Sequence, residues 1–254
     1  MNNYNPPILD DVLISSFYMS NTIEYYNYHK KLMNFFDIPI QYFNNHDVIR
    51  LENELKIQPK TNHHHARFID AIMNLDYKYF IFLDIDSIPL TKDSIYNTIK
   101  ICKEEECILG NLQFNCRAEP SEFNMYLGRN HLYCSPAYLC ISKSIYDKIG
   151  KLSAKRDLSI KSHNADVAQG FSAKCDELGI KKILIPPVDI RVNRNRYKWN
   201  NDDYVIGIGT THYLNYNELE LYTYHNYCSR MKRHFGYFVE EINNIIGVSN
   251  DKTL

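Results

Sequence analysis

The chain has 254 residues, of which 44% are apolar and 23% are charged, a composition that fits a globular protein with a sizeable core. Its formal net charge of −1 excludes a strong overall field that would draw nucleic acid or an anionic membrane towards it. Seven cysteines without a CxxC pair predict reduced thiols. With no signal-peptide pattern at the start and no long apolar run, we expect a cytoplasmic protein without a membrane span.

The first predicted strand covers residues 12–18, a short apolar run that ends in small polar and aromatic residues. Ser16 and Tyr18 are expected at its carboxyl end. A helix then continues to about Phe36, and residues 38–43 predict a second strand. This strand–helix–strand start is typical of an α/β fold.

Another helix is predicted after the run His63-His64-His65-Ala66-Arg67, where apolar residues recur with helical spacing. Three consecutive histidines suggest a metal site at first sight. Consecutive side chains splay around a helix or strand, however, so they cannot all bind one ion. We therefore expect a polar loop or a helix start here.

An acidic strand end is the most informative feature of the chain. Residues 79–83 are apolar without alternation, which indicates a strand covered on both faces, and Asp84 and Asp86 follow directly. A turn at Pro89 would let both carboxylates reach one cation, which would relieve their repulsion. The alternative is that both residues merely cap the helix expected after Thr91.

The stretch Leu83-Asp84-Ile85-Asp86 after a hydrophobic strand resembles the DxD motif of GT-A-fold glycosyltransferases. The resemblance implies a Rossmann-like α/β domain with a mixed, mostly parallel central sheet flanked by helices. It also implies that Asp84 and Asp86 hold Mn²⁺ or Mg²⁺ on the diphosphate of a nucleotide-sugar donor. A sugar would then move to the hydroxyl of a glycan, protein or other acceptor.

The same resemblance implies roles for residues near the start of the chain. The end of the first strand contacts the base and ribose in this family, so Ser16 and Tyr18 are candidates, with Tyr18 as the stacking partner. A core or rim tyrosine is the alternative for Tyr18. Arg67 is the residue on its helix that could reach the diphosphate or the base, and Asp84 is expected to contact the donor as well as the ion.

Three further strands are predicted at residues 107–114, 132–143 and 181–187, and the aperiodic residues 115–131 predict a loop that shapes an acceptor pocket. Many members of the family carry a glycine in the sugar pocket where this chain has Ser135-Pro136-Ala137. The resemblance therefore does not extend to the detailed shape of that pocket.

A second acidic position lies further along the chain. Asn164 is a suitable N-cap for a helix that ends at Gly179, which places Asp166 in the first turn. Stabilisation of the helix dipole is one explanation for an acidic residue there. By its place along the chain Asp166 also resembles the family's acidic residue that contacts the sugar or acts as the catalytic base.

Two polar stretches follow the last predicted strand. Residues 191–199 carry four cations among aromatic residues, and we interpret them as a solvated loop that could alternatively grip the donor diphosphate or a nucleic-acid acceptor. His212 lies in a Gly/Thr-rich context and matches by its place the histidine that completes the metal site in the family. A structural role is the alternative. An amphipathic helix over residues 231–246 would pack on the domain or mediate a homo-oligomer.

We expect one domain over residues 1–254, with a nucleotide-binding half at about 8–115, an acceptor and sugar half at about 116–215, and a C-terminal helical extension at 216–254. One rival interpretation is a phosphatase of the haloacid dehalogenase type, whose DxD usually opens the domain and is followed by Thr or Val. Another is a non-catalytic protein of the same fold that binds nucleotide-sugars or carbohydrates.

Overall fold

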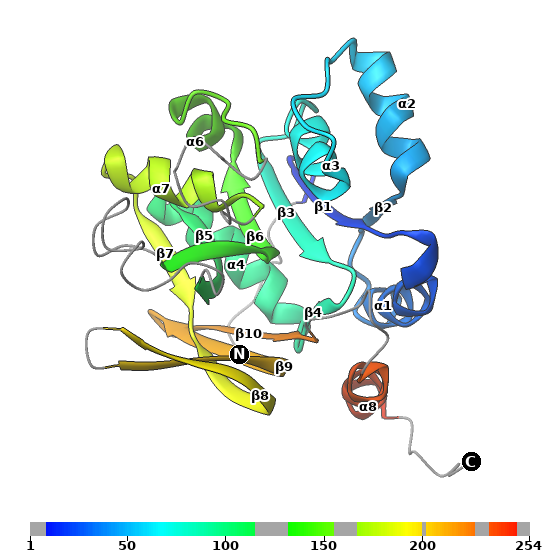
Figure 1. Cartoon of the computed structure of the whole chain (residues 1–254), viewed down its shortest axis with the longest axis vertical. Coiled ribbons are helices and arrows are strands. Elements are labelled where there is room, and N and C mark those ends of the chain that lie inside the picture. Colours follow the sequence, from blue (N-terminus) through cyan, green and yellow to red (C-terminus); the bar gives the residue numbers. More distant parts are fainter. Residues whose placement is uncertain (1–8, 115–131, 155–166, 200–201, 227–233, 248–254) are drawn as a thin grey trace, which may run out of the picture.

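The computed structural model describes residues 9–114, 132–154, 167–199, 202–226 and 234–247, and Figure 1 shows a larger sheet flanked by helices and a smaller sheet at the lower edge of the view. A six-stranded sheet, here sheet A, has the order β2-β1-β3-β6-β5-β7, and a four-stranded sheet, here sheet B, has the order β4-β10-β9-β8. The strands of sheet A are β1 (Val12–Phe17), β2 (Gln41–Phe43), β3 (Tyr79–Asp84), β5 (Ile108–Phe114), β6 (Leu132–Ser142) and β7 (Lys182–Ile185). Those of sheet B are β4 (Ser87–Pro89), β8 (Pro187–Trp199), β9 (Asp202–Tyr216) and β10 (Leu219–His225).

The helices lie between and around these strands. They are α1 (Ile23–Phe35), α2 (Asn45–Leu55), α3 (His64–Ile72), α4 (Lys92–Glu105), α6 (Lys143–Lys148), α7 (Gln169–Glu177) and α8 (Phe235–Ile246). None of the helices in the described ranges is long and apolar enough to cross a bilayer.

Sheet A is mixed and mostly parallel, which confirms the predicted α/β class. Its pairs β1–β2, β1–β3 and β5–β7 run parallel, and only β6 runs antiparallel to its neighbours β3 and β5. Sheet B is antiparallel throughout. The parallel pairs bring the carboxyl ends of β1 and β3 to one edge of sheet A, the edge where open α/β sheets bind ligands.

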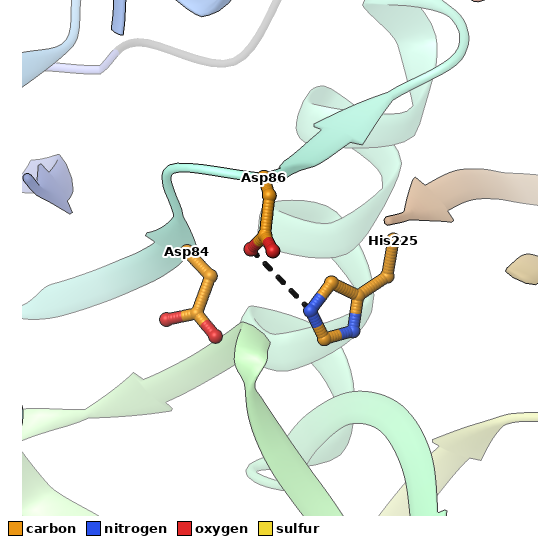
Figure 2. A group of neighbouring side chains, drawn as sticks. All are labelled: Asp84, Asp86 and His225. Carbon is orange, nitrogen blue, oxygen red and sulfur yellow. Dashed lines mark ion pairs between the residues drawn. The ribbon is translucent and has the colours of Figure 1, made fainter. Parts of the chain in front are cut away.

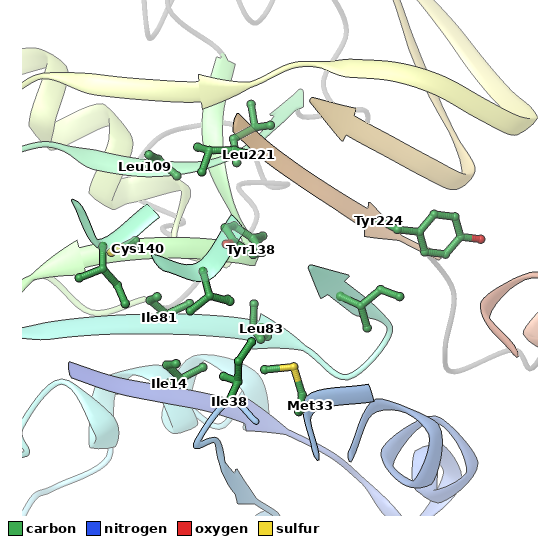
Figure 3. Packing of buried hydrophobic residues seen from close by; sticks show 14 of the residues in the cluster. Ile14, Met33, Ile38, Ile81, Leu83, Leu109, Tyr138, Cys140, Leu221 and Tyr224 are labelled. Atoms are coloured by element: carbon green, nitrogen blue, oxygen red, sulfur yellow. The ribbon is translucent and has the colours of Figure 1, made fainter. Parts of the chain in front are cut away.

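Two apolar clusters cover the two faces of sheet A. One cluster packs the sheet against α2, α3, α6 and α7. The other packs it against α1, α4, α8 and the strand β10 of sheet B, and Figure 3 shows part of this cluster, from Ile14 and Ile81 to Leu221 and Tyr224. The five cysteines in the described part of the chain are free and buried within these layers.

Strand β3 lies in the middle of sheet A, between β1 and β6, and confirms the prediction of a strand covered on both faces. Phe80 and Phe82 pack into the cluster beside α3, whereas Ile81 and Leu83 pack into the cluster beside α1 and α4. All four side chains are buried. The apolar run without alternation follows from this two-sided burial.

The sequence interpretation missed sheet B. Residues 191–199, expected to form a loop, belong to β8, and His212 lies inside β9 rather than beyond the sheet. The two strands pair along most of their length, with Arg196 opposite Val205 and Lys198 opposite Asp203. Residues 188–193 alternate apolar and polar side chains as a strand does, but the polar run at residues 193–196 interrupts this alternation.

Two helices also differ from the expectation. Helix α2 was not predicted, although Asn44 caps it by accepting from the backbone N–H groups of His46 and Asp47. Helix α7 begins at Gln169, not after Asn164, so Asp166 precedes the helix and falls outside the described residues. The predicted acceptor loop at 115–131 lies outside them as well.

Candidate metal centre

The acidic strand end leads into a tight connection between the two sheets. Strand β3 ends at Asp84, and Ser87 already belongs to β4, where it lies opposite His225 of β10. The backbone N–H of Asn226 donates to the carbonyl oxygen of Asp86 over 2.8 Å. Pro89, expected to force a turn, instead lies in the edge strand β4, where a missing N–H is tolerated.

This connection brings a histidine from a distant part of the sequence to two carboxylates that are close in sequence. Asp84, Asp86 and His225 each offer a ligand atom, and these atoms all lie within 4.8 Å of one another (Figure 2). The Nε2 atom of His225 is 3.5 Å from Oδ1 of Asp86, and both of these side chains are buried. Asp84 is more open, with 27% of its side chain exposed. The group therefore has a buried side and an open side.

The geometry and chemistry of this group suit a divalent cation. Two ligands of one ion with bonds of about 2.1 Å lie at most about 4.2 Å apart, so a small closure of the three side chains would suffice. Carboxylate oxygens are ligands for Mg²⁺ and Mn²⁺, and the imidazole nitrogen favours a transition metal. Two nearby carboxylates would also repel each other less around a cation.

A second histidine lies on the outer side of the group. The Nε2 atom of His65, at the start of α3, is 3.1 Å from Oδ1 of Asp84. The ring of His65 stacks on Phe17, with ring centroids 6.3 Å apart and an interplanar angle of 5°. A polar loop or a helix start was expected around residues 63–65, and the helix start is confirmed. The contact between His65 and Asp84 was not foreseen.

The structure places His225, not His212, beside the two carboxylates. His212 is buried in β9 opposite Thr223, on the same face of sheet B as His225 and diagonal to it. Burial, together with the nearby His225, lowers the pKa of His212 to about 3. Its Nδ1 atom has no hydrogen-bond partner among the described residues. His212 was a candidate by its place along the chain and its Gly/Thr-rich context, but it is His225 of β10 that lies with the two carboxylates.

No local sequence pattern pointed to His225. Residues 219–225 form a strand whose last residue is this histidine, directly beside the strand that follows the acidic turn. Strand β10 was not predicted, because residues 216–254 were expected to form a helical extension. Because the pairing of β10 with β4 spans more than 130 residues, local sequence pattern does not reveal it.

The remaining predicted site residues have other surroundings. Ser16 is fully buried in β1, and its hydroxyl has no partner among the described residues. Tyr18 is half-buried, stacks on Tyr26 at a centroid distance of 4.6 Å, and accepts a hydrogen bond from Asn44 over 3.2 Å. These contacts hold Tyr18 at the carboxyl end of β1.

Arg67 lies on α3 but is engaged with an acidic partner. Its Nε atom donates to Oε1 of Glu52 over 3.0 Å, and a terminal nitrogen donates to the other oxygen of the same carboxylate. Hydrogen bonding to Glu52 raises the pKa of Arg67. The charge of the guanidinium is therefore balanced within the protein.

The similarity of this chain to known proteins is limited. No protein-family model matches the chain, and no curated protein sequence matches it. Among solved structures, the chain is similar to the catalytic domain of Drosophila β1,4-galactosyltransferase 7 in complex with xylobiose, with a TM-score of 0.35 and 10% identity over 83% of this chain and 91% of that one.

Proposed function

We propose that the protein is a metal-dependent glycosyltransferase of the GT-A type, which moves a sugar from a nucleotide-diphosphate sugar to an acceptor hydroxyl. The observation that carries this proposal is the convergence of Asp84, Asp86 and His225 at the carboxyl end of the central strand β3. Two carboxylates and an imidazole at this edge of an α/β sheet suit an ion that holds a diphosphate.

The proposed roles follow from burial. Asp86 and His225 lie on the buried side of the group and hold the ion from within. Asp84 lies on the open side, so the donor diphosphate approaches past it. A bound Mn²⁺ or Mg²⁺ would neutralise the charge of the departing nucleoside diphosphate as a Lewis acid. The imidazole ligand leads us to favour Mn²⁺.

Other residues complete the proposal. Tyr18, at the end of β1, is the proposed stacking partner of the base. Asp166 is the proposed residue that orients the sugar or takes the proton of the acceptor hydroxyl. Ser16 and Arg67 are weaker candidates for the donor, because Ser16 is fully buried and the Arg67 guanidinium already binds Glu52.

Release of nucleoside diphosphate from a panel of nucleotide-sugars, measured with and without Mn²⁺, tests this function. We expect metal-dependent release from at least one donor, and loss of that release in Asp84→Asn and Asp86→Asn with unchanged circular dichroism. Asp93→Asn is the matched control, since Asp93 is an exposed residue in the first turn of α4. Equal release by all three variants would contradict the proposal.

Two additional assays separate the two rivals. A haloacid dehalogenase-type phosphatase would release inorganic phosphate from phosphate esters, with Asp84 as the nucleophile. A binding protein of the same fold would show Mn²⁺-dependent donor binding by calorimetry without release of nucleoside diphosphate. Either result would overturn the proposed transfer.

A further inference from the structure

A third histidine contacts the backbone beside the acidic turn. His29 lies on α1 and is fully buried. Its Nε2 atom is 3.0 Å from the carbonyl oxygen of Ser87, and its Nδ1 atom is 2.8 Å from the hydroxyl oxygen of Tyr42 on β2. His29 is not a member of the group formed by the two carboxylates and His225.

The partners of His29 define its tautomer. A carbonyl oxygen can only accept a hydrogen bond, so the Nε2 atom carries the hydrogen and donates it to Ser87. The Nδ1 atom then accepts from the hydroxyl of Tyr42. Burial lowers the pKa of His29 to about 4, so the ring is neutral at neutral pH, as this arrangement requires. The ring of Tyr42 also packs edge-on against His29, at a centroid distance of 5.6 Å.

The carbonyl group of Ser87, to which His29 donates, lies next to the candidate metal centre. Ser87 follows Asp86 directly and lies opposite His225 in the pairing of β4 with β10. The preceding carbonyl, that of Asp86, accepts from the backbone N–H of Asn226 over 2.8 Å. Two successive carbonyl groups are thus held by partners from different elements, one by β10 and its extension and one by α1.

We propose that His29, oriented by Tyr42, is a positioning residue that holds the backbone between Asp84 and Ser87 and so fixes Asp86 relative to His225. The metal-related part of this inference rests on the proposed function, whereas the backbone part does not. A site held in place before its ligand arrives loses less freedom on binding. Residues that orient metal ligands without touching the ion typically change metal affinity by about 10–100-fold when replaced.

Two substitutions of His29 distinguish positioning from simple core packing. The terminal amide of glutamine reaches about as far as Nε2 of histidine, so His29→Gln can still donate to Ser87. The shorter amide of asparagine reaches about as far as Nδ1, so His29→Asn keeps a polar group near Tyr42 but loses Ser87. Leu32→Ala is the matched control, because Leu32 is buried on the same helix and has no polar group.

The first readout is hydrogen exchange of the Asn226 amide, which donates to Asp86, in the metal-free protein. We expect exchange at least tenfold faster in His29→Asn, relative to amides in β1 of the same sample, and near wild-type rates in His29→Gln. Leu32→Ala should speed exchange evenly or not at all. Equal and uniform changes in His29→Asn and Leu32→Ala would overturn the proposal.

The second readout is the dissociation constant of Mn²⁺ alone, measured by calorimetry. We expect it to rise at least tenfold in His29→Asn and by less than about threefold in His29→Gln and Leu32→Ala. A wild-type constant in His29→Asn would overturn the proposal. If the wild type binds Mn²⁺ without sugar transfer, the proposed function fails while this comparison still decides the role of His29. If the wild type binds no Mn²⁺, hydrogen exchange alone decides it.

Discussion

At the scale of single residues, the ion pair with Glu52 indicates a structural role for Arg67 rather than a role in donor binding. Only 6% of the Glu52 side chain and 18% of the Arg67 side chain are exposed. Arg67→Met leaves a buried carboxylate without its cation, and we expect it to lower the free energy of unfolding by about 2–4 kcal/mol. Urea unfolding measures this change. Replacing Glu52 by Gln in the same chain should recover part of it.

Donor affinity provides the contrast for Arg67. Because its charge is already balanced by Glu52, we expect Arg67→Lys to change the donor dissociation constant by less than about threefold. A folded Arg67→Lys variant with wild-type stability and donor binding at least tenfold weaker would contradict this account. It would restore Arg67 as a contact of the diphosphate.

Two buried histidines predict how stability depends on pH. Burial lowers the pKa of His29 to about 4 and that of His212 to about 3, below the ordinary value of 6.5. As the pH falls below 6.5, both histidines therefore take up a proton in the unfolded chain but stay neutral in the folded chain. Their stabilising contribution is complete above pH 6.5 and decreases towards pH 4. We expect a loss of about 1.4 kcal/mol per histidine between pH 7.5 and pH 5.5.

Urea unfolding at these two pH values provides the test. His29→Gln should remove about half of the loss, because it removes one of the two groups that take up a proton on unfolding. His46→Gln should leave the loss unchanged, since His46 is exposed. A pH dependence that is the same in all three proteins would contradict the assignment of buried neutral histidines.

Individual residues differ in how well the sequence predicts them. Asp84 and Asp86 stand out because charged residues directly after a doubly covered strand have few structural explanations. His225 does not stand out, since its role depends on the pairing of β10 with β4. The contact of His65 with Asp84 likewise depends on how α3 packs over β3. The local sequence pattern thus predicts the two carboxylates at the end of β3, whereas the two histidines beside them depend on tertiary contacts.

At the scale of elements, an irregular pairing of β5 with β6 lies where β5 contacts sheet B. The register of β5 against β6 shifts between Gly110 and Asn111, and the Asn111 side chain accepts a hydrogen bond from Thr223 of β10 over 2.8 Å. A Cβ atom at Gly110 would lie 2.6 Å from the carbonyl oxygen of Tyr138. Such an approach requires the strands to separate, so only glycine fits here.

Gly110→Ala should therefore lower the free energy of unfolding by about 1–3 kcal/mol. Gly236→Ala is the matched control, since a Cβ atom there meets nothing within 4 Å and the residue lies in helix α8. We expect that change to raise stability by about 0.5–1 kcal/mol. Thermal unfolding of the two variants measures both effects, and a neutral Gly110→Ala would contradict the tight approach of β5 and β6.

Elements with strong local signals were predicted well. Strand β3 and helices α1, α4 and α8 have long apolar stretches or regular apolar spacing, and the structure confirms each of them. The ribbon of β8 and β9 was missed because the polar run at residues 193–196 interrupts the alternation in β8. Helix α8 packs on α1 of the same chain, with Phe238 beside Tyr25 at a ring-centroid distance of 5.0 Å. This confirms one of the two predicted roles of the helix.

At the scale of the whole molecule, the candidate metal centre joins the two sheets. Asp84 comes from the end of sheet A, His225 from sheet B, and Asp86 from the connection between them. An ion bound by all three would link the sheets in the folded state only. Mn²⁺ at about 100 times its dissociation constant should then stabilise the fold by about 2.7 kcal/mol and raise the melting temperature by about 5–10 °C.

The measurement that tests this most directly is the Mn²⁺-induced shift of the melting temperature in the wild type, His225→Asn and His212→Asn. The two variants replace buried histidines on the same face of sheet B. We predict that the shift is lost in His225→Asn and kept in His212→Asn, even if both variants melt earlier than the wild type without metal. A shift that persists in His225→Asn and disappears in His212→Asn would contradict the assigned metal centre.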